Sequence, residues 1–355
     1  MKALVLAGGT GSRLRPFTFT SAKQLLPIAN KPVLFYGLEA IAAAGITETA
    51  IVVGRHGTEI REAVGDGARF GLRVTYLQQD SPLGLAHAVL LAREFLADDD
   101  FLLYLGDNYL QEGLTGFVRR AETEGSAARL LLTPVADPTA FGVAELDEHG
   151  DVLRLEEKPD RPRSDLALIG VYAFGPQIHT AVRAISPSGR GELEITDAVQ
   201  WLIEQGMRVS AETTERPWRD TGSVEDLLEV NRHVLDGMTG LVEGKVDAHS
   251  TLVGRVRIAE GAVVRGSHVV GPVVIGAGTV VSNSSIGPYT SIAEDCRIED
   301  SAIAHSVLLR GAQVEGASRI ETSLIGRGAA VSPAPRLPGA HRLVIGDHSR
   351  VQLTS

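Results

Sequence analysis

The sequence predicts an α/β protein in two parts, a mostly parallel sheet covered by helices and then a C-terminal parallel β-helix. Three observations predict it. Short apolar segments alternate with helix-like segments from residue 1 to about 236. From residue 241 onward aromatic residues nearly vanish, and only Tyr289 remains. In the same region, aliphatic residues recur every five or six positions.

Composition narrows the class of protein before any motif is considered. The 355 residues carry a formal net charge of −10, which argues against an electrostatic nucleic-acid partner. No apolar run is long enough to span a bilayer, and the first residues lack the apolar core of a secretory signal. The single cysteine, Cys296, excludes an intrachain disulfide and a cysteine cluster for zinc. We expect a cytoplasmic protein of about two domains, with no nucleic-acid or membrane partner.

The first part reads as strands alternating with helices. Lys2–Ala7 is apolar without polar alternation, as in a buried parallel strand. Pro32 opens an apolar helix that ends at Gly45. Further expected strands are Thr49–Val53, Leu72–Gln78, Phe101–Leu105, Arg129–Thr133 and Leu166–Phe174, with a hairpin of Gly142–Leu146 and Val152–Glu156. Further expected helices are Leu85–Leu96, Phe117–Thr123, Asp197–Glu204 and Val224–Leu235.

The second part carries a different period. Its aliphatic positions are Leu252, Ile258, Val264, Val270, Ile275, Val281, Ile286, Ile292, Ile298, Ile303, Leu309, Val314, Ile320, Ile325 and Val331. Steps of five and six exclude an amphipathic helix and indicate hexapeptide repeats, in which each side of a triangular coil points one aliphatic residue inward. In known hexapeptide-repeat proteins such a coil is a left-handed β-helix. Val344–Gly346 is predicted to add a partial coil or cap. We predict domains at residues 1–240 and 241–355.

A glycine-rich loop follows the first predicted strand. Residues 6–16 read LAGGTGSRLRP, and such a turn exposes successive backbone N–H groups that can hold phosphate oxygens. It is not a P-loop, and Leu14 replaces the third glycine of the dinucleotide fingerprint. Two cations beside the loop, Arg13 and Lys23, suit a triphosphate. The alternatives are an ordinary tight turn and ordinary surface cations.

A carboxylate stands at the end of another predicted strand. Asp107 follows Phe101–Leu105 after a single glycine, and ligands of open α/β sheets bind at the carboxyl ends of strands. Together with Asp220 it forms a candidate Mg²⁺ site, because Mg²⁺ takes one or two protein carboxylates plus substrate phosphates. Asp107 as a turn residue or helix cap is the alternative.

Nine segments in order carry a family resemblance. They are LAGGTGSRLRP (6–16), KQLLPI (23–28), QDSPLGLAHA (79–88), LGDN (105–108), FGV (141–143), LEEKP (155–159), LALIGVY (166–172), GELEITD (191–197) and WRDTG (218–222). The chain resembles the sugar nucleotidylyltransferases, and among them the long glucose-1-phosphate thymidylyltransferases with a C-terminal β-helix. The resemblance implies a Rossmann-like nucleotidyltransferase sheet and a Mg²⁺-dependent reaction of dTTP with glucose 1-phosphate.

The resemblance also implies roles at matched positions. Catalysis falls to Arg13, Lys23, Asp107 and Asp220, with Asp107 and Asp220 as the metal ligands. Nucleotide contacts fall to Leu6, Gly8, Gly9, Gly11, Ser12, Arg13, Lys23, Gln79, Gly84 and Asp107. Sugar-phosphate contacts fall to Asn108, Gly142, Glu157, Lys158, Leu168 and Glu194. Gln79 would read the base, because its amide donates and accepts in one plane. Taken singly, Gln79 could cap a turn, Glu157–Lys158 could be a solvated strand end, and Glu194 could lie at a helix N-terminus.

Other functions remain open at this point. UTP or another sugar 1-phosphate could be the substrate. The β-helix could transfer acyl groups, with a base among His249, His268, His305, His341 and His348. The chain could also be a catalytically silent interaction subunit, although the intact Arg13, Lys23, Asp107 and Asp220 oppose this. We favour the β-helix as an oligomerisation and stability module of a homo-oligomer, whose removal would change assembly more than chemistry.

Overall fold

The computed structural model describes residues 1–215 and 218–333. The chain forms two compact units. The sheet unit comprises Met1–Ser12, Ser21–Leu26 and Pro32–Gly222, and the coil unit comprises Arg13–Thr20, Pro27–Lys31 and the chain from Ser223 onward. Two short N-terminal segments therefore group with the C-terminal part. The division at residue 240 stays a prediction, and Val344–Gly346 lies outside the described residues.

The sheet unit is built on nine strands in the order β10-β9-β11-β6-β1-β4-β5, with β8 beside β11 and β12 beside β8. They are β1 (Lys2–Ala7), β4 (Glu48–Val53), β5 (Arg73–Gln78), β6 (Phe101–Leu105), β8 (Ala128–Pro134), β9 (Gly142–Leu146), β10 (Val152–Glu157), β11 (Leu166–Phe174) and β12 (Val209–Thr213). The pairings leave only β10 and β11 running against the other strands. The mostly parallel, Rossmann-like sheet is thus confirmed.

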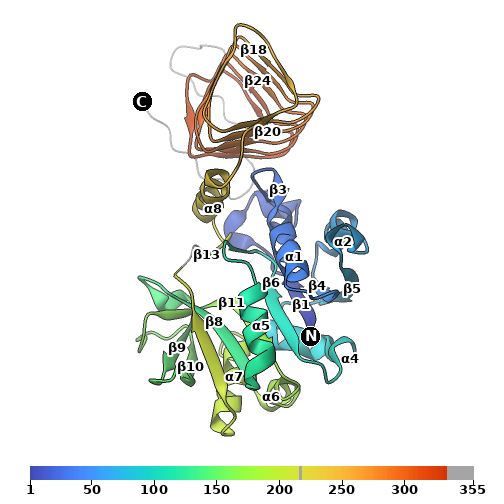
Figure 1. The fold of residues 1–355 in the computed structure, drawn as a ribbon, viewed down its shortest axis with the longest axis vertical. Coiled ribbons are helices and arrows are strands. Elements are labelled where there is room, and N and C mark those ends of the chain that lie inside the picture. The colour runs from blue at the N-terminus through green and yellow to red at the C-terminus, as the bar shows by residue number, and fades with distance from the viewer. Residues whose placement is uncertain (216–217, 334–355) are drawn as a thin grey trace. The chain divides into compact units, whose positions relative to one another are not determined.

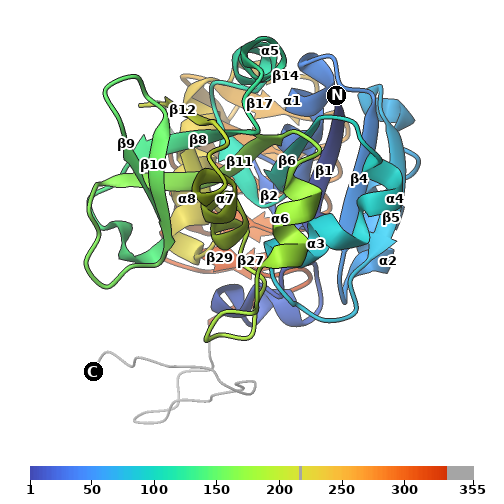
Figure 2. The same cartoon turned by 90° about the horizontal axis from the view of Figure 1, so that it is seen from below.

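Helices cover both faces of this sheet (Figure 2). They are α1 (Val33–Ala43), α2 (Gly57–Val64), α3 (Leu85–Leu91), α4 (Arg93–Leu96), α5 (Thr115–Glu124), α6 (Ile178–Ala184) and α7 (Ile195–Glu204), and α8 (Val224–Asp236) belongs to the coil unit. Leu4 and Leu6 of β1 enter the core beneath α3, α6 and α7, whereas Ala3 and Val5 enter the core beneath α1, α2 and α5. Burial on both faces explains why β1 is apolar without alternation. No helix among the described residues is long and apolar enough to cross a membrane.

The structure differs from the predicted elements at a few places. The predicted helix Leu85–Leu96 is interrupted at Ala92, between α3 and α4. Helices α2 and α6 and strand β12 were not predicted. Helix α2 has only eight residues, of which Gly57, Ile60 and Val64 are buried. So short a helix shows no clear helical period in the sequence. Strand β12 is defined by its pairing with β8, a partner distant in sequence.

The coil unit contains three parallel sheets that form the sides of a triangular coil (Figure 1). The first sheet contains β14 (Leu241–Val242), β17 (Val256–Ile258), β20 (Val273–Ile275), β23 (Thr290–Ile292), β26 (Val307–Leu308) and β29 (Leu324–Ile325). The second contains β15 (Lys245–Val246), β18 (Val263–Arg265), β21 (Val280–Ser282), β24 (Arg297–Glu299), β27 (Gln313–Glu315) and β30 (Ala330–Val331). The third contains β16 (Thr251–Val253), β19 (His268–Val270), β22 (Ser285–Ile286), β25 (Ala302–Ala304) and β28 (Ile320–Glu321). The parallel β-helix is confirmed, while its left-handedness stays a prediction.

One coil corresponds to 17 residues at many positions, which is two steps of six and one of five. Most predicted inward residues form the aliphatic core of the coil. Two predictions were one residue too late, because Val269 and Leu308 belong to the core cluster instead of Val270 and Leu309. The position of the five-residue step in each coil is not visible from the spacing of aliphatic residues alone. Val331, also predicted to point inward, is 36% exposed.

A buried side-chain amide on α8, that of Asn231, links the N-terminal segment Pro27–Lys31 to the rest of the coil unit. Asn231 is fully buried, and its Oδ1 accepts hydrogen bonds from the Ala29 N–H at 2.9 Å and the Ser291 hydroxyl at 2.7 Å. The Asn30 side chain donates to the Ile292 carbonyl at 2.7 Å. These bonds join β2 (Pro27–Ile28), β3 (Lys31–Pro32) and their turn to the β-helix, so residues far apart in sequence hold each other in place.

Candidate functional site

Loops that leave one edge of the sheet form a cavity of about 310 Å³. We call it the glycine-loop pocket. Its lining includes the predicted Leu6, Gly8, Gly9, Gln79, Gly84 and Asp107, together with Thr10, Gln24 and Glu192. Most of these residues lie at or just after the carboxyl ends of β1, β5 and β6, and Gly84 precedes helix α3. Gln24 and Glu192 come from other segments of the chain. The parallel strand direction therefore collects segments that are far apart in sequence into one cavity.

A second cavity of about 160 Å³ adjoins the first. We call it the carboxylate pocket. Its lining includes the predicted Asn108, Gly142, Glu157, Leu168, Glu194 and Asp220, together with Thr196 and Trp218. Both cavities are also lined by Leu85, Leu105 and Asp107. Asp107 thus lies where the two pockets meet.

Lys23 reaches this meeting point. Its Nζ lies 2.5 Å from Asp107 Oδ2, and the lysine side chain is only 8% exposed. Lys23 is therefore not an ordinary surface cation. A buried ammonium group needs a charged partner, and Asp107 supplies it. An ammonium group at this position can also bind a phosphate oxygen.

The second predicted metal ligand is placed beside the first by a short antiparallel pair. Strand β13 (Trp218–Asp220) pairs with β7 (Asn108–Leu110), and Asp220 stands opposite Asn108. The N–H and the hydroxyl of Thr221 both donate to the Asp107 carbonyl, at 3.1 and 2.9 Å.

This pair of carboxylates fits a magnesium ion. Asp107 and Asp220 both border the carboxylate pocket, and Mg²⁺ characteristically takes one or two protein carboxylates and completes its shell with phosphates and water. Within the described part of the chain, no group of three or more His, Cys, Asp or Glu residues forms a richer site. The donor set therefore suits a cation that arrives with a phosphate ligand.

The Gln79 side chain bonds within its own segment of the sequence. Its Nε2 lies 3.0 Å from His87 Nδ1 and 3.4 Å from the Gly84 carbonyl oxygen. Gly84 has a φ of +100°, and a Cβ there would collide with the backbone of Leu193, so glycine is required at this position. His87 was given no role from the sequence, although it lies within the QDSPLGLAHA segment.

The carboxylate pocket contains a network that the sequence only partly predicted. Arg190 donates to Glu157 at 3.1 Å and to Glu194 at 2.9 Å, although no role was predicted for it. Glu157 also accepts a bond from Thr196, and Glu194 accepts one from Ser188. Glu194 precedes α7 but makes no capping bond. The sequence feature that could have pointed to Arg190 is its position directly before the matched segment GELEITD.

The same network shifts the acidity of Glu157. Burial, and secondly the neighbouring charge of Glu194, raise the pKa of the Glu157 carboxyl group. Lys158, Thr196 and Arg190 act in the opposite direction and only partly compensate. A carboxylate that is costly to ionise is well suited to accept hydrogen bonds from neutral hydroxyl groups.

Some predicted residues lie elsewhere. Gly11, Ser12 and Lys158 do not line either pocket, and Arg13 groups with the coil unit. Lys158 is exposed, and its Nζ lies 3.7 Å from Glu157. Their substrate roles stay predictions. Asn108 lines the carboxylate pocket but is fully buried, and its amide donates to the Ile169 carbonyl beside the irregular centre of β11.

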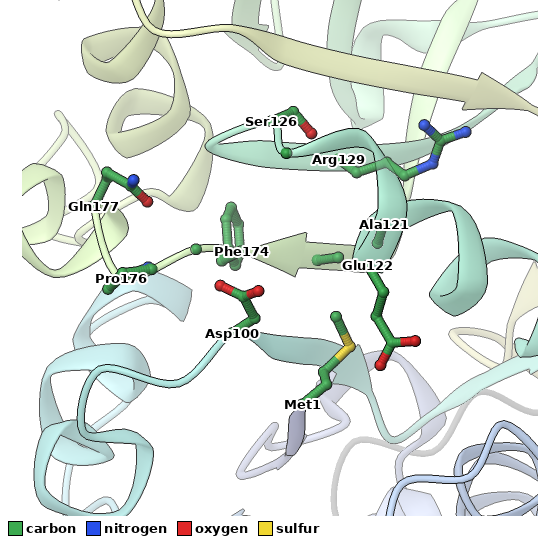
Figure 3. A pocket seen from close by; sticks show the side chains of 12 residues that line it. Met1, Asp100, Ala121, Glu122, Ser126, Arg129, Phe174, Pro176 and Gln177 are labelled. Carbon is green, nitrogen blue, oxygen red and sulfur yellow. The ribbon is translucent and has the colours of Figure 1, made fainter.

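A third cavity, of about 200 Å³, lies near Met1 and contains none of the predicted residues. Figure 3 shows the carboxylates of Asp100 and Glu122 among its lining side chains. Its one arginine, Arg129, is paired with Glu124 and Glu212. This cavity therefore offers anionic groups and a neutralised cation, which is unsuited to a phosphate-bearing ligand.

Comparisons with known proteins agree with this geometry. The nucleotidyl transferase family model matches residues 2–237, and the GMPPB C-terminal domain model matches residues 269–354. Glucose-1-phosphate thymidylyltransferases from Streptomyces griseus and Streptomyces antibioticus are 60% and 56% identical to this chain, each over 100% of both chains. A low-salt glycan biosynthesis nucleotidyltransferase from Haloferax volcanii is 47% identical over 99% of this chain and 100% of its own.

A solved structure supports the same assignment. A putative glucose-1-phosphate thymidylyltransferase from Bacillus anthracis, in complex with a sucrose, is 33% identical, with a TM-score of 0.63. The match covers 68% of this chain and 98% of that one. The nine ordered segments, the two adjoining pockets and these full-length relatives lead to one conclusion: the chain belongs to the nucleotidyl transferase family.

Proposed function

We propose that this chain transfers a thymidylyl group from dTTP to glucose 1-phosphate, which gives dTDP-glucose and pyrophosphate. The observation that carries the proposal is the meeting of two pockets at the Lys23–Asp107 pair. One pocket offers a glycine-rich backbone and an amide, which suits a nucleotide. The other offers carboxylates that can accept sugar hydroxyl bonds. The two full-length relatives with this activity in their names support the choice of substrates.

The reaction needs no proton transfer. A phosphate oxygen of the sugar substrate attacks the α-phosphorus of dTTP, and the bond from that phosphorus to the β-phosphate oxygen breaks. The electron pair leaves with pyrophosphate. Because two anions must approach while charge develops on the leaving group, pre-placed cations are the main requirement. The pockets hold both substrates on either side of Asp107, which also supplies the orientation that an encounter in solution lacks.

Different residues of the chain have different roles in this proposed reaction. The backbone of Gly8 and Gly9 binds the triphosphate, with Leu6, Gly11 and Ser12 in the same loop. Lys23 and Arg13 neutralise the phosphates. Asp107 and Asp220 would hold Mg²⁺, which when bound withdraws charge from the phosphates and orients them. On the sugar side, Glu157 and Glu194 accept hydroxyl bonds, and Arg190 and Lys158 offer positive charge to the sugar phosphate. Gly142, Leu168 and Asn108 shape the sugar pocket.

A pyrophosphate-release assay tests this proposal. dTTP, UTP, CTP, ATP and GTP are each offered with glucose 1-phosphate and with its 2-acetamido analogue, in the presence of Mg²⁺. Preferred turnover of dTTP with glucose 1-phosphate is expected. A clear preference for UTP would overturn the thymidylyl assignment. If no pair of substrates released pyrophosphate, the proposed enzymatic activity itself would be wrong.

The other candidate activities have less support. His249, His268 and His305 are exposed on the β-helix, and His341 and His348 lie outside the described residues. None of the three described histidines lines the pockets discussed above. Acyl transfer therefore has no described site that favours it.

The affinity for glucose 1-phosphate should depend on pH through Glu157. Because the pKa of Glu157 is raised, the group protonates at a higher pH than an exposed glutamate. Protonation removes acceptor capacity, so we expect the KM for glucose 1-phosphate to rise as the pH falls through this raised pKa. Steady-state kinetics at saturating dTTP measures the effect. Glu157→Gln serves as the control, because it keeps the titration of the substrate phosphate. An identical pH profile for both proteins would contradict the role of Glu157.

A further inference from the structure

The carboxamide of Gln79 has two hydrogen-bond partners on one side. Its Nε2 faces the Gly84 carbonyl oxygen at 3.4 Å and His87 Nδ1, on helix α3, at 3.0 Å. Its Oε1 lies on the Gly8 side, because a Cβ built on Gly8 would come within 3.2 Å of that oxygen. Gly8, Gly84 and Gln79 all line the glycine-loop pocket. Both Gln79 and His87 are half-buried.

These partners determine which end of the amide points where. A backbone carbonyl can only accept, so the group beside Gly84 must be the NH₂ of Gln79. The same NH₂ then donates to His87, which accepts at Nδ1 and carries its proton on Nε2. The Gly84 contact is long, at 3.4 Å, so the shorter bond to His87 is the stronger restraint. The carbonyl oxygen of Gln79 is left on the Gly8 side.

We infer that His87 is a positioning residue that fixes the Gln79 carboxamide with its oxygen toward the base, and so selects bases that offer an N–H donor. The inference rests on the proposed function, in which Gln79 reads the base. Thymine and uracil present N3–H, which Gln79 Oε1 can accept. Cytosine presents an unprotonated N3, whose lone pair would face that oxygen without a proton between them.

The selection therefore depends on the bond from Gln79 to His87. Without an acceptor at position 87, the Gln79 carboxamide keeps only the weak Gly84 contact and can flip, which exchanges the positions of its oxygen and its NH₂. A turned amide presents its NH₂ to the base, which suits cytosine N3 and no longer suits thymine N3–H. Loss of the bond to His87 should therefore lower the discrimination between dTTP and CTP. His87 itself does not line either substrate pocket, so other steps should change little.

Two substitutions separate the acceptor from the rest of the side chain. His87→Leu removes the acceptor while it fills similar space, and His87→Asn keeps an acceptor oxygen near the place of Nδ1. His87→Ala provides a second acceptor-free variant if the leucine protein does not fold. Each full-length variant is assayed for KM and kcat with dTTP and with CTP, and for the KM of glucose 1-phosphate.

For His87→Leu we expect the ratio of kcat/KM for dTTP over CTP to fall roughly tenfold, the range expected for one hydrogen bond. The KM for dTTP should rise, whereas kcat at saturating dTTP and the KM for glucose 1-phosphate should stay near their original values. His87→Asn should restore the ratio. An unchanged ratio, or equal losses with dTTP, CTP and glucose 1-phosphate, would overturn the inference.

The unmodified protein separates this inference from the proposed function. If it makes no dTDP-glucose, the proposed function fails before any variant is measured. If it does, and His87→Leu discriminates between dTTP and CTP as well as the unmodified protein does, only the role of His87 fails.

Discussion

Replacement of Asp107 by asparagine is expected to lower kcat for pyrophosphate release by roughly a thousandfold, the scale of losing one preorganised electrostatic contact at a reacting centre. Asp107 borders both pockets and pairs with Lys23 at 2.5 Å. The amide keeps the shape of the carboxylate but binds Mg²⁺ and an ammonium group far less well. A near-original rate would show that Asp107 is not a metal ligand.

Stability measurements separate the proposed catalytic role of Asp107 from its structural role as the partner of Lys23. Asp107→Asn leaves the buried ammonium group of Lys23 without its ionic partner, which should cost roughly 1–3 kcal/mol of unfolding free energy. The double substitution Lys23→Met with Asp107→Asn removes both charges and should regain much of this stability, because no buried charge remains unpaired. Its activity should stay low. Thermal denaturation and pyrophosphate release on the same preparations measure the two effects, and a double variant that regained turnover would contradict the assigned roles.

The fold was largely predictable because two patterns of apolar residues in the sequence reflect two kinds of burial. Strand β1 is covered on both faces, so it reads as an unbroken apolar run, and the coils bury one residue in five or six. What escaped prediction depends on partners distant in sequence. Strand β12 exists through its pairing with β8. The exact inward residue of a coil, such as Val269, depends on where its short step falls.

The candidate site was predictable only where a residue lies within a recognised segment. Gln79 and Glu194 were identified in this way, but their partners His87 and Arg190 were not given a role. Those two act through side chains that meet only after folding. The grouping of Arg13 with the coil unit was likewise invisible, because a sequence boundary near residue 240 says nothing of which early loop packs against the later domain.

Deletion of residues 241–355 is expected to reduce kcat/KM by roughly a hundredfold, in addition to changing assembly. The contacts within the coil unit lead to this expectation, in contrast to the sequence alone, which favoured assembly as the main effect. The segment Arg13–Thr20 belongs to the coil unit and places Phe17 beside Gly326. Without the β-helix, this segment loses its contact with Gly326, and the turn at Ala29–Asn30 loses the Ile292 carbonyl that accepts from Asn30. The turn keeps the bond from Ala29 to Asn231. Small displacements of a group proposed to bind substrate, such as Arg13, suffice for losses of this size.

A single substitution in the intact chain tests the same dependence without removing a domain. Asn231→Ala leaves the Ala29 N–H and the Ser291 hydroxyl without their acceptor, so we expect a loss of about 1–3 kcal/mol in stability. We also expect the KM for dTTP to rise about tenfold. Gln313→Ala, at an exposed β-helix position, is the matched control and should change neither quantity.

The oligomeric state of each variant, measured by light scattering, decides between the two roles of the β-helix. We expect the unmodified protein and Asn231→Ala to form the same homo-oligomer, because Asn231 is fully buried inside the coil unit. A raised KM with unchanged assembly then assigns the effect to the anchored N-terminal segment. If the truncated chain instead folds, changes its assembly and keeps full kcat/KM, the β-helix is an oligomerisation module alone. The anchoring bonds to Asn231 would then serve stability without serving the reaction.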